Sequence, residues 1–392
     1  MGRHPPNALL TRRTPSTAGV RRPWPGDPRS AAHSRREEPP LHSATMKIAH
    51  VREVNAPAGA PWRLAAALDG APGPASLVQP TEWLDLEIAR RRAVAADPRL
   101  THNSALHRAP VTTLDDHIAA GSRVMALADL IDGFVRRGDG DDDDAVLSAA
   151  DLRFGPPVLR PPSVRDFYAF EGHVRTMWER RGGEVPEAWY RLPIFYFSNT
   201  SEIRGPGDPI WSPAASAELD YELEVAALVD TPGRDLTPER AEEAIGGYTI
   251  FNDWSARDLQ REETAVRLGP AKGKDFASSF GPWLVTPDEL ANARPGDATG
   301  PDLAMTAEVN GVETSRGGWS DAQFSFGAML ARASADVRLR PGDLVGSGTV
   351  GGGCLLEVRD ATLGRYLEPG DTVTLTVERL GSLTNPIVER PR

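Results

Sequence analysis

The sequence has little of several features that would each mark a particular class of protein. It contains one cysteine, Cys354, so it cannot form a disulfide within the chain, and we expect a reducing, cytoplasmic setting. We find no run of about eighteen apolar residues, which argues against a membrane-spanning helix. Its 44 Lys and Arg are outnumbered by 55 Asp and Glu, giving a net charge of −11. That balance argues against a nucleic-acid partner, which needs a basic face.

Histidine is scarce in the larger part of the chain. Of the 8 histidines, all but one lie between His4 and His117, and only His173 lies beyond them. Chemistry in that part that requires an imidazole therefore has a single candidate. A lone histidine is more often a packing or surface residue, so both interpretations stay open at this point.

Composition divides the 392 residues into three parts. Residues 1–45 are rich in Arg and Pro and lack a periodic apolar pattern, which predicts a disordered extension. It is either an extension upstream of a start at Met46 or an Arg-rich targeting segment. Residues 46–150 predict a small N-terminal domain with strands and helices, ending in an acidic linker. Residues 151–392 alternate short apolar strands with Pro and Gly turns, which predicts a β-rich second domain.

The expected elements can be placed only coarsely. In the first domain we expect strands at Lys47–Val54 and Trp62–Leu68, and helices at Thr81–Ala96 and Ser122–Phe134. In the second domain we expect two early helices. One spans about residues 164–181, and the other spans residues 237–245, with Thr237 as its N-cap.

The stretch LDYELEVAALV places carboxylates at the mouth of an apolar strand. In strand geometry Glu222 and Glu224 share one face. FNDWSARDLQ adds Asp253 at a strand-to-helix junction, and RDFYAFEGHV adds Asp166 near the start of a helix. Converging carboxylates would repel one another unless they bound a hard divalent cation, and no Cys/His pair has zinc-ligand spacing. A solvated strand face and a helix cap are the alternatives.

Three further motifs carry polar groups suited to a ligand. Arg257 and Gln260 follow Asp253 at helical spacing and could grip an anionic substrate, unless they form an ordinary solvated helix face. LGPAKGKDF presents Lys274 in a glycine-rich turn without phosphate-loop spacing, where it could meet a carboxylate or enolate oxygen or remain a surface lysine. GSGTVGGGCLLE allows backbone amides to approach a ligand, although flexible glycine loops are common.

These blocks, in this order, resemble the fumarylacetoacetate hydrolase family, bacterial branch, over about residues 155–392. The resemblance implies an α+β fold: a β-rich mixed β-sandwich roll with a smaller N-terminal α/β domain, assembled as a cytoplasmic homodimer. It implies a hydrolase that cleaves a C–C bond in a fumarylacetoacetate- or acylpyruvate-like dioxo acid, in aromatic catabolism. The alternatives are an isomerase or tautomerase, hydratase or decarboxylase of 2-oxo acids at the same metal site, or a non-catalytic member.

The resemblance also assigns roles to individual residues. It implies that a divalent cation, Mg²⁺ or Ca²⁺ with Mn²⁺ as a further candidate, is bound by Asp166, Glu222, Glu224 and Asp253. It implies three catalytic residues, which are His173 as general base, Glu357 as its partner, and Lys274. The substrate contacts that it implies are Tyr168, Tyr196, Arg257, Gln260 and Thr349. Asp220 receives no role, and we expect it to cap or solvate the strand entrance away from the metal. Compared with fumarylacetoacetase itself, the loop between Gln260 and Lys274 looks longer and the GTVGGG loop looks shorter. Both loops are expected to contact the substrate, so the identity of the substrate stays open.

Overall fold

The structure is a computed structural model, and its described residues all belong to one compact unit. The described residues are 46–57, 59–68, 79–103, 105–137, 144–296 and 298–391. The predicted disordered extension at residues 1–45 and most of the acidic linker lie outside them. The predicted division into two domains near residue 150 stays a prediction.

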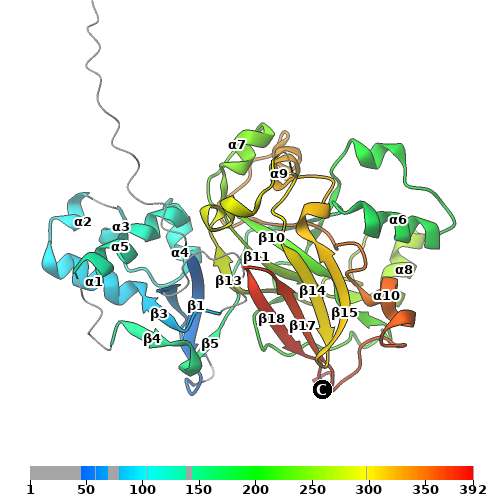
Figure 1. The fold of residues 1–392 in the computed structure, drawn as a ribbon, viewed down its shortest axis with the longest axis horizontal. Coiled ribbons are helices and arrows are strands. Elements are labelled where there is room, and N and C mark those ends of the chain that lie inside the picture. The colour runs from blue at the N-terminus through cyan, green and yellow to red at the C-terminus, as the bar shows by residue number, and fades with distance from the viewer. Residues whose placement is uncertain are drawn as a thin grey trace, which may run out of the picture. The chain divides into compact units, whose positions relative to one another are not determined.

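A sheet of twelve strands forms the main scaffold of the described residues (Figure 1). Its strands are β1 (Lys47–Glu53), β2 (Arg63–Ala67), β3 (Glu82–Asp85), β4 (Val146–Ser148), β5 (Leu152–Phe154), β6 (Val164–Phe167), β7 (Phe195–Ser198), β8 (Ile203–Arg204), β10 (Leu223–Val229), β11 (Ile245–Asp253), β13 (Ser278–Val285) and β16 (Leu344–Gly346). Their order is β4-β3-β2-β1-β13-β11-β10-β16-β6-β7, with β5 paired to β1 and β8 to β13. Pairing is antiparallel except at β16–β6 and β13–β8.

A second sheet of four strands, in the order β15-β14-β17-β18, shares a hydrophobic core with the first. Its strands are β14 (Ala304–Val309), β15 (Val312–Gly318), β17 (Thr372–Val377) and β18 (Gly381–Pro386). Strand β17 has one buried face, because Val373, Leu375 and Val377 are buried and the threonines between them are partly exposed. The predicted α+β fold with a β-rich, two-sheet second part is therefore confirmed.

The helices lie at the margins of the sheets. They are α1 (Leu86–Ala96), α2 (Leu100–Asn103), α3 (Ala105–Arg108), α4 (Leu114–Ala119), α5 (Ala128–Arg137), α6 (Glu171–Arg180), α7 (Pro238–Glu242), α8 (Arg257–Ala265), α9 (Phe326–Ser334) and α10 (Leu355–Val358). Thr237 caps α7 as predicted, with its side chain accepting from the Arg240 amide. Figure 1 shows α6, α8 and α10 grouped together, away from α1–α5. Within the described ranges, no helix combines the length and apolar character needed to cross a membrane.

Two predicted helices begin later than the sequence indicated, because a strand precedes each. The segment expected to be helical from residue 164 first forms β6, and α6 begins only at Glu171. Asp166 therefore lies on a strand, and the prediction that it lies near the start of a helix is wrong. Likewise β3 occupies the start of the expected helix Thr81–Ala96, and α1 follows it. Pairing with neighbouring strands overrides the local helical pattern in both places.

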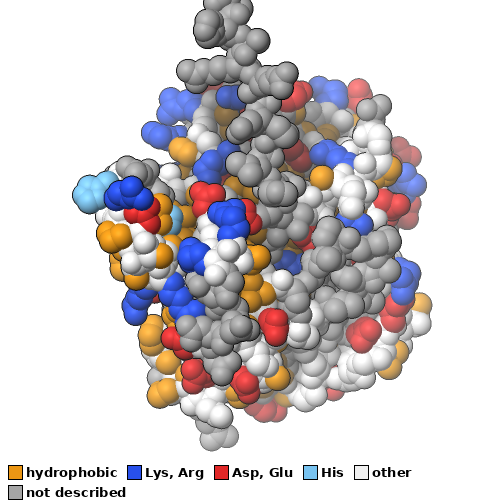
Figure 2. Space-filling view, turned by 60° about the vertical axis from the view of Figure 1, so that its left-hand side comes forward, with side chains coloured by type: hydrophobic (Ala, Val, Ile, Leu, Met, Phe, Trp, Pro, Cys, Tyr) orange, Lys and Arg blue, Asp and Glu red, His pale blue; other side chains and the backbone are white. Residues whose placement is uncertain are grey.

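The N-terminal segment continues the main sheet. Strand β1 pairs with β13, where Lys47 faces Val285 and Ile48 faces Leu284. A second hydrophobic cluster mixes side chains of both parts of the chain, including the stacked rings of Phe251 and Phe280, whose centroids are 4.5 Å apart. On the face shown in Figure 2, acidic and basic side chains are interspersed and apolar ones are scattered between them.

Asp371 organises the turn before β17. Its carboxylate accepts hydrogen bonds from Arg365 at 2.7 and 2.8 Å, from Asn310 Nδ2 at 2.8 Å and from the Glu368 amide at 2.9 Å. The Arg365 guanidinium and these other donors lower the pKa of Asp371 to about 2 from 3.8. Because the folded pKa is below the unfolded one, the contribution to stability is complete above about pH 4 and is lost as the pH falls through about 2.

We therefore expect Asp371→Asn to destabilise the protein mainly at neutral pH. The free energy of unfolding should fall by about 1 kcal/mol there, since the site is partly screened by solvent. Near pH 2 the loss should be clearly smaller. Urea titrations at both pH values measure the difference, and an equal loss at both would contradict the role assigned to the ionised carboxylate.

Candidate active site

Four buried carboxylates meet where neighbouring strands of the main sheet lie side by side. They come from different segments: Asp166 from β6, Glu222 from the residues just before β10, Glu224 from β10 and Asp253 from the end of β11. One oxygen of each lies within 4.8 Å of the others. The strand order explains the meeting, because β10 lies between β11 and β16, and β16 lies beside β6. The structure thus brings together the set that the resemblance implied.

The glycine-rich loop completes this cluster from the backbone side. The Gly348 amide donates to Asp166 Oδ1 at 3.2 Å and to Glu224 Oε2 at 3.0 Å. Gly348 has φ +81°, and a Cβ there would lie 2.6 Å from the Phe167 carbonyl oxygen, so glycine is required. At Gly346 a Cβ would lie 2.5 Å from Asp166 Oδ1. These glycines let the loop approach the carboxylates closely.

The carboxylates differ in their affinity for protons. Burial, and then the charge of Asp253, raise the pKa of Asp166 to about 8. Burial also raises the pKa of Glu224 well above its usual value, and Asp166 adds to this. Burial opposes ionisation of Glu222 too, but Lys274 and Arg257 hold its pKa at about 2. Without a further cation, Asp166 and Glu224 therefore tend to keep protons near neutral pH.

The charges and donor atoms of this cluster fit a hard divalent cation. Lys274 Nζ lies 2.5 Å from both Glu222 Oε2 and Asp253 Oδ2, and Arg257 Nη1 lies 2.8 Å from Glu222 Oε1. Since Arg257 is shared with Asp220, four ionised carboxylates would retain at least two uncompensated negative charges. Asp253 Oδ1 is buried and has no hydrogen-bond partner. An all-oxygen donor set with a free, buried oxygen suits Mg²⁺, Ca²⁺ or Mn²⁺.

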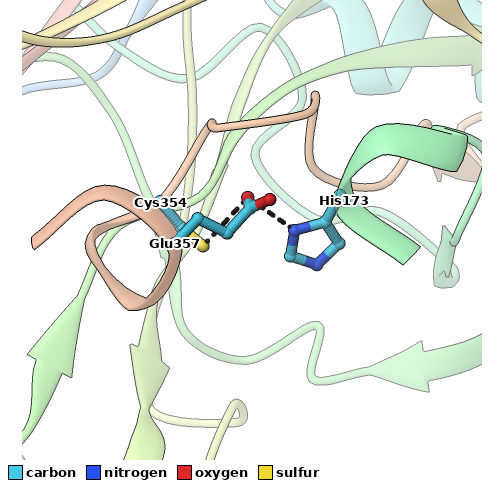
Figure 3. Close-up of side chains that lie close together, drawn as sticks. All are labelled: His173, Cys354 and Glu357. Atoms are coloured by element: carbon cyan, nitrogen blue, oxygen red, sulfur yellow. Dashed lines mark hydrogen bonds and ion pairs between the residues drawn. The ribbon is translucent and has the colours of Figure 1, made fainter. Parts of the chain in front are cut away.

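A buried histidine–carboxylate pair lies beside this cluster. His173 on α6 and Glu357 on α10 approach to 2.7 Å between Nδ1 and Oε2, and their side chains are 6% and 3% exposed (Figure 3). Although burial opposes it, the hydrogen bond and charge of His173 lower the pKa of Glu357. An ionised Glu357 accepts the Nδ1 proton, which leaves Nε2 of a neutral imidazole as a proton acceptor. The Tyr168 ring packs edge-on against His173.

One cavity of about 310 Å³ collects the predicted side chains. Its polar lining includes Asp166, Tyr168, His173, Tyr196, Glu222, Arg257, Gln260, Lys274 and Thr349. Among the predicted residues, Glu224, Asp253 and Glu357 lie behind this lining. Apolar side chains, among them Met177, Ile194 and Leu356, form another part of the wall. The lining of the cavity therefore combines charged and apolar side chains.

Several residues predicted to bind substrate are also held by the protein itself. The Tyr196 hydroxyl donates to Asp253, and the Thr349 hydroxyl donates to Glu224 Oε1 at 3.3 Å. Arg257 donates to Gln260 Oε1 at 3.0 Å, but its buried Nη2 has no hydrogen-bond partner. These contacts fix the side chains that face the cavity, and their role in substrate binding stays a prediction.

Asp220 has a structural role that the sequence did not indicate. It is fully buried, so the expectation that it solvates the strand entrance is wrong. Its carboxylate accepts from Arg257 Nε at 2.8 Å and from the amides of Leu355 and Leu356 at 2.8 and 2.9 Å. Those amides open α10, which carries Glu357. The contact between Asp220 and the Leu355 amide joins residues more than 130 positions apart, so no local sequence pattern predicts it. Only the fold shows that Asp220 positions both Arg257 and the helix that carries Glu357.

We expect Asp220→Asn to lower kcat by about 10–100-fold, as losses of supporting partners around a site often do. Asparagine keeps the size but loses the charge that holds Arg257. Asp258→Asn is a matched control, because Asp258 also accepts a backbone amide but bonds to Ser216 and Ala217 outside the cavity. The control should keep its kcat. Equal kcat losses in the two variants, or none at Asp220, would contradict the positioning role.

Comparison with known proteins places the chain in a family of enzymes. The model of the fumarylacetoacetate (FAA) hydrolase C-terminal family matches residues 163–388. This match covers more than half of the chain, so the chain belongs to that family, and the resemblance deduced from the motifs is confirmed.

Individual relatives differ in their named activities. Protein Rv2993c of Mycobacterium tuberculosis is 33% identical over 62% of this chain and 80% of its own length. A mitochondrial oxaloacetate tautomerase of Xenopus laevis is 32% identical, covering 50% of this chain and 58% of the relative. A fumarylacetoacetase of Arabidopsis thaliana is 30% identical, covering 54% and 63%. The chain thus spans under two thirds of the length of these last two relatives.

Solved structures support the same fold. The fumarylacetoacetate hydrolase of Exiguobacterium antarcticum matches 88% of this chain and 100% of its own length, with a TM-score of 0.57 and 24% identity. At this identity the match concerns the fold alone. It covers a larger share of the chain than the family model does.

Proposed function

We propose that the protein is a metal-dependent hydrolase that cleaves a C–C bond in a fumarylacetoacetate- or acylpyruvate-like dioxo acid. The observation that carries this proposal is the position of the His173–Glu357 pair beside an oxygen-only acidic cluster, at one cavity. Hydrolysis of a chelating diketone acid requires a base and a site for a Lewis acid that face the same cavity.

The residues divide the chemistry between them. Asp166, Glu222, Glu224 and Asp253 would hold the divalent cation, which when bound supplies a Lewis acid for the oxygens of the dioxo unit. His173 Nε2 takes a proton from water, and Glu357 stabilises the imidazolium through Nδ1. The hydroxide attacks the carbonyl carbon, the C–C bond breaks, and its electron pair leaves as an enolate. The proton on His173 is then delivered to the enolate carbon.

Lys274 is placed to stabilise the negative charge that develops on the leaving fragment. Its ammonium group has three N–H donors, and two of them reach Glu222 and Asp253. Its third contact, to the Asp253 carbonyl oxygen, is long at 3.5 Å and can give way to a substrate oxygen, and Lys274 lines the cavity. A buried ammonium beside a developing oxyanion is worth far more than the same charge in water.

A tautomerase is the second candidate, and the Xenopus relative named as an oxaloacetate tautomerase favours it. The same His173 could move a proton between carbon and oxygen without any attack by water. The apolar part of the cavity wall supports the hydrolase instead, since oxaloacetate has no apolar group to place against Met177 and Leu356. An acylpyruvate presents an acyl chain suited to that wall.

The test is a substrate panel with product identification. Acylpyruvates of increasing acyl length, fumarylpyruvate and enol oxaloacetate are incubated with the Mg²⁺- or Mn²⁺-loaded protein, and loss of enol absorbance is followed. Two fragments from an acylpyruvate support the hydrolase. A single isomer indicates a tautomerase, CO₂ indicates a decarboxylase, and no turnover of any compound contradicts the proposal. The homodimer, the cytoplasmic location and the role in aromatic catabolism stay predictions.

A further inference from the structure

The single cysteine lies against the catalytic pair. Cys354 Sγ is 3.4 Å from Glu357 Oε2, the same oxygen that lies 2.7 Å from His173 Nδ1. Figure 3 shows the carboxylate between the thiol and the imidazole. One potential ligand atom of each residue lies within 4.8 Å of the others, and Cys354 is fully buried. His173 thus joins Cys354 and Glu357, from a distant segment, in a compact nitrogen, sulfur and oxygen donor set.

This donor set differs in kind from the carboxylate cluster. Thiolate and imidazole are preferred ligands of Zn²⁺, whereas Mg²⁺ and Ca²⁺ prefer oxygen alone. In zinc sites the ligand atoms lie about 2.0–2.3 Å from the metal, so neighbouring ligand atoms are about 3–4 Å apart. The 3.4 Å between Cys354 Sγ and Glu357 Oε2 already meets this requirement, and the contact between His173 and Glu357 has to lengthen by roughly half an ångström. The ligand atoms of Cys354 and His173 lie within 4.8 Å of each other and have to come to about 3–4 Å.

A second observation also indicates that the cluster can take a ligand. Glu357 Oε1 is buried and accepts no well-formed hydrogen bond, although the side chain is only 3% exposed. A carboxylate oxygen in this state retains lone pairs for a cation. The cluster adjoins the active-site cavity, because His173 and Leu356, the residue before Glu357, belong to its lining.

We propose that His173, Cys354 and Glu357 form a zinc site whose occupation inhibits the enzyme; the inhibition rests on the proposed function, but the binding does not. On binding, the Cys354 thiol releases its proton to solvent, and Sγ, His173 Nδ1 and a Glu357 oxygen donate to Zn²⁺. Because Nδ1 then holds the metal, the proton of the neutral imidazole resides on Nε2. That nitrogen can no longer accept a proton from water, so the base is blocked.

Binding can be tested without any substrate. The protein is saturated with Mg²⁺ and titrated with Co²⁺, whose thiolate complexes give a charge-transfer absorption. Since Cys354 is the only cysteine, such a band can come from no other residue. We expect it in the unaltered protein, its disappearance on adding Zn²⁺, and its absence in Cys354→Ser and Cys354→Ala. Absence of the band in the unaltered protein, or its persistence in the variants, overturns the site.

Inhibition is the second arm of the experiment. In excess Mg²⁺, Zn²⁺ should inhibit the unaltered protein at a concentration at least about tenfold lower than it inhibits Cys354→Ser, with each activity normalised to its own zinc-free value. Equal inhibition of both, relieved by more Mg²⁺, would place zinc at the carboxylate cluster and overturn the proposal. If neither variant folds, X-ray absorption of the zinc-loaded unaltered protein decides, and a spectrum without a zinc–sulfur contact counts against the site.

Discussion

Replacing His173 by alanine should lower kcat by at least about a hundredfold on the true substrate, because general-base help is typically worth roughly 10²–10⁴. His173 is the only histidine in the lining of the cavity among the described residues. Its Nδ1 is already bonded to Glu357, so Nε2 is the group available to take a proton from water. Steady-state kinetics with the loaded protein measure the loss.

The matched control for this variant is His117→Ala. His117 is also a buried histidine, with Nε2 bonded to the Arg123 carbonyl, but it lies outside the cavity lining. The control should lose stability and keep kcat. His173→Ala should keep its affinity for Mg²⁺, since His173 is not part of the carboxylate cluster. Near-normal turnover by His173→Ala would refute its assignment as the base.

Removing divalent ions with EDTA should lower activity by about a thousandfold or more, since a Lewis acid contributes several kcal/mol to such reactions. Adding Mg²⁺ or Mn²⁺ should restore activity. Ion binding should also release protons, because the pKa of Asp166 is raised to about 8 and that of Glu224 is raised as well. The affinity for Mg²⁺ should therefore increase from pH 6 to pH 9, as these protons compete less.

Calorimetric titrations in buffers with different ionisation enthalpies count the released protons and follow the affinity. Glu289→Gln is a suitable control, because Glu289 is buried and paired with Lys47 at 3.4 Å but lies outside the cluster. It should bind Mg²⁺ like the unaltered protein, whereas Glu224→Gln should bind it much more weakly. Full activity after EDTA treatment, with ion removal verified, would refute the metal requirement.

The site residues could be proposed from the sequence because each lies within a short, recognisable motif. The sequence predicts Asp253 at the end of a strand, where it lies, and Glu222 and Glu224 at the mouth of a buried strand, where Glu222 precedes β10 and Glu224 lies near its start. Their convergence with Asp166 depends on the order of β6, β16, β10 and β11, which no single motif encodes. The alternation in the first motif is also interrupted, since β9 (Leu219–Asp220) ends before β10 begins.

Local patterns failed where long-range contacts decide the structure. The helical pattern around Asp166 gave way to pairing of β6 with β16 and β7. Asp220 looked like a solvated strand end, yet it is buried against Arg257 and the start of α10. Cys354 indicated only a reducing setting, and its contact with Glu357 appears only in the fold. Contacts of this kind depend on packing between distant segments.

The most direct test of the proposed hydrolysis is to run the reaction in water labelled with oxygen-18 and to analyse the products by mass spectrometry. The account predicts two fragments from an acylpyruvate, with one labelled oxygen in the carboxylate formed at the attacked carbonyl, and loss of this product in His173→Ala. A single product of unchanged mass would contradict it. Release of CO₂ would also contradict it if no fragment carries the label in a new carboxylate.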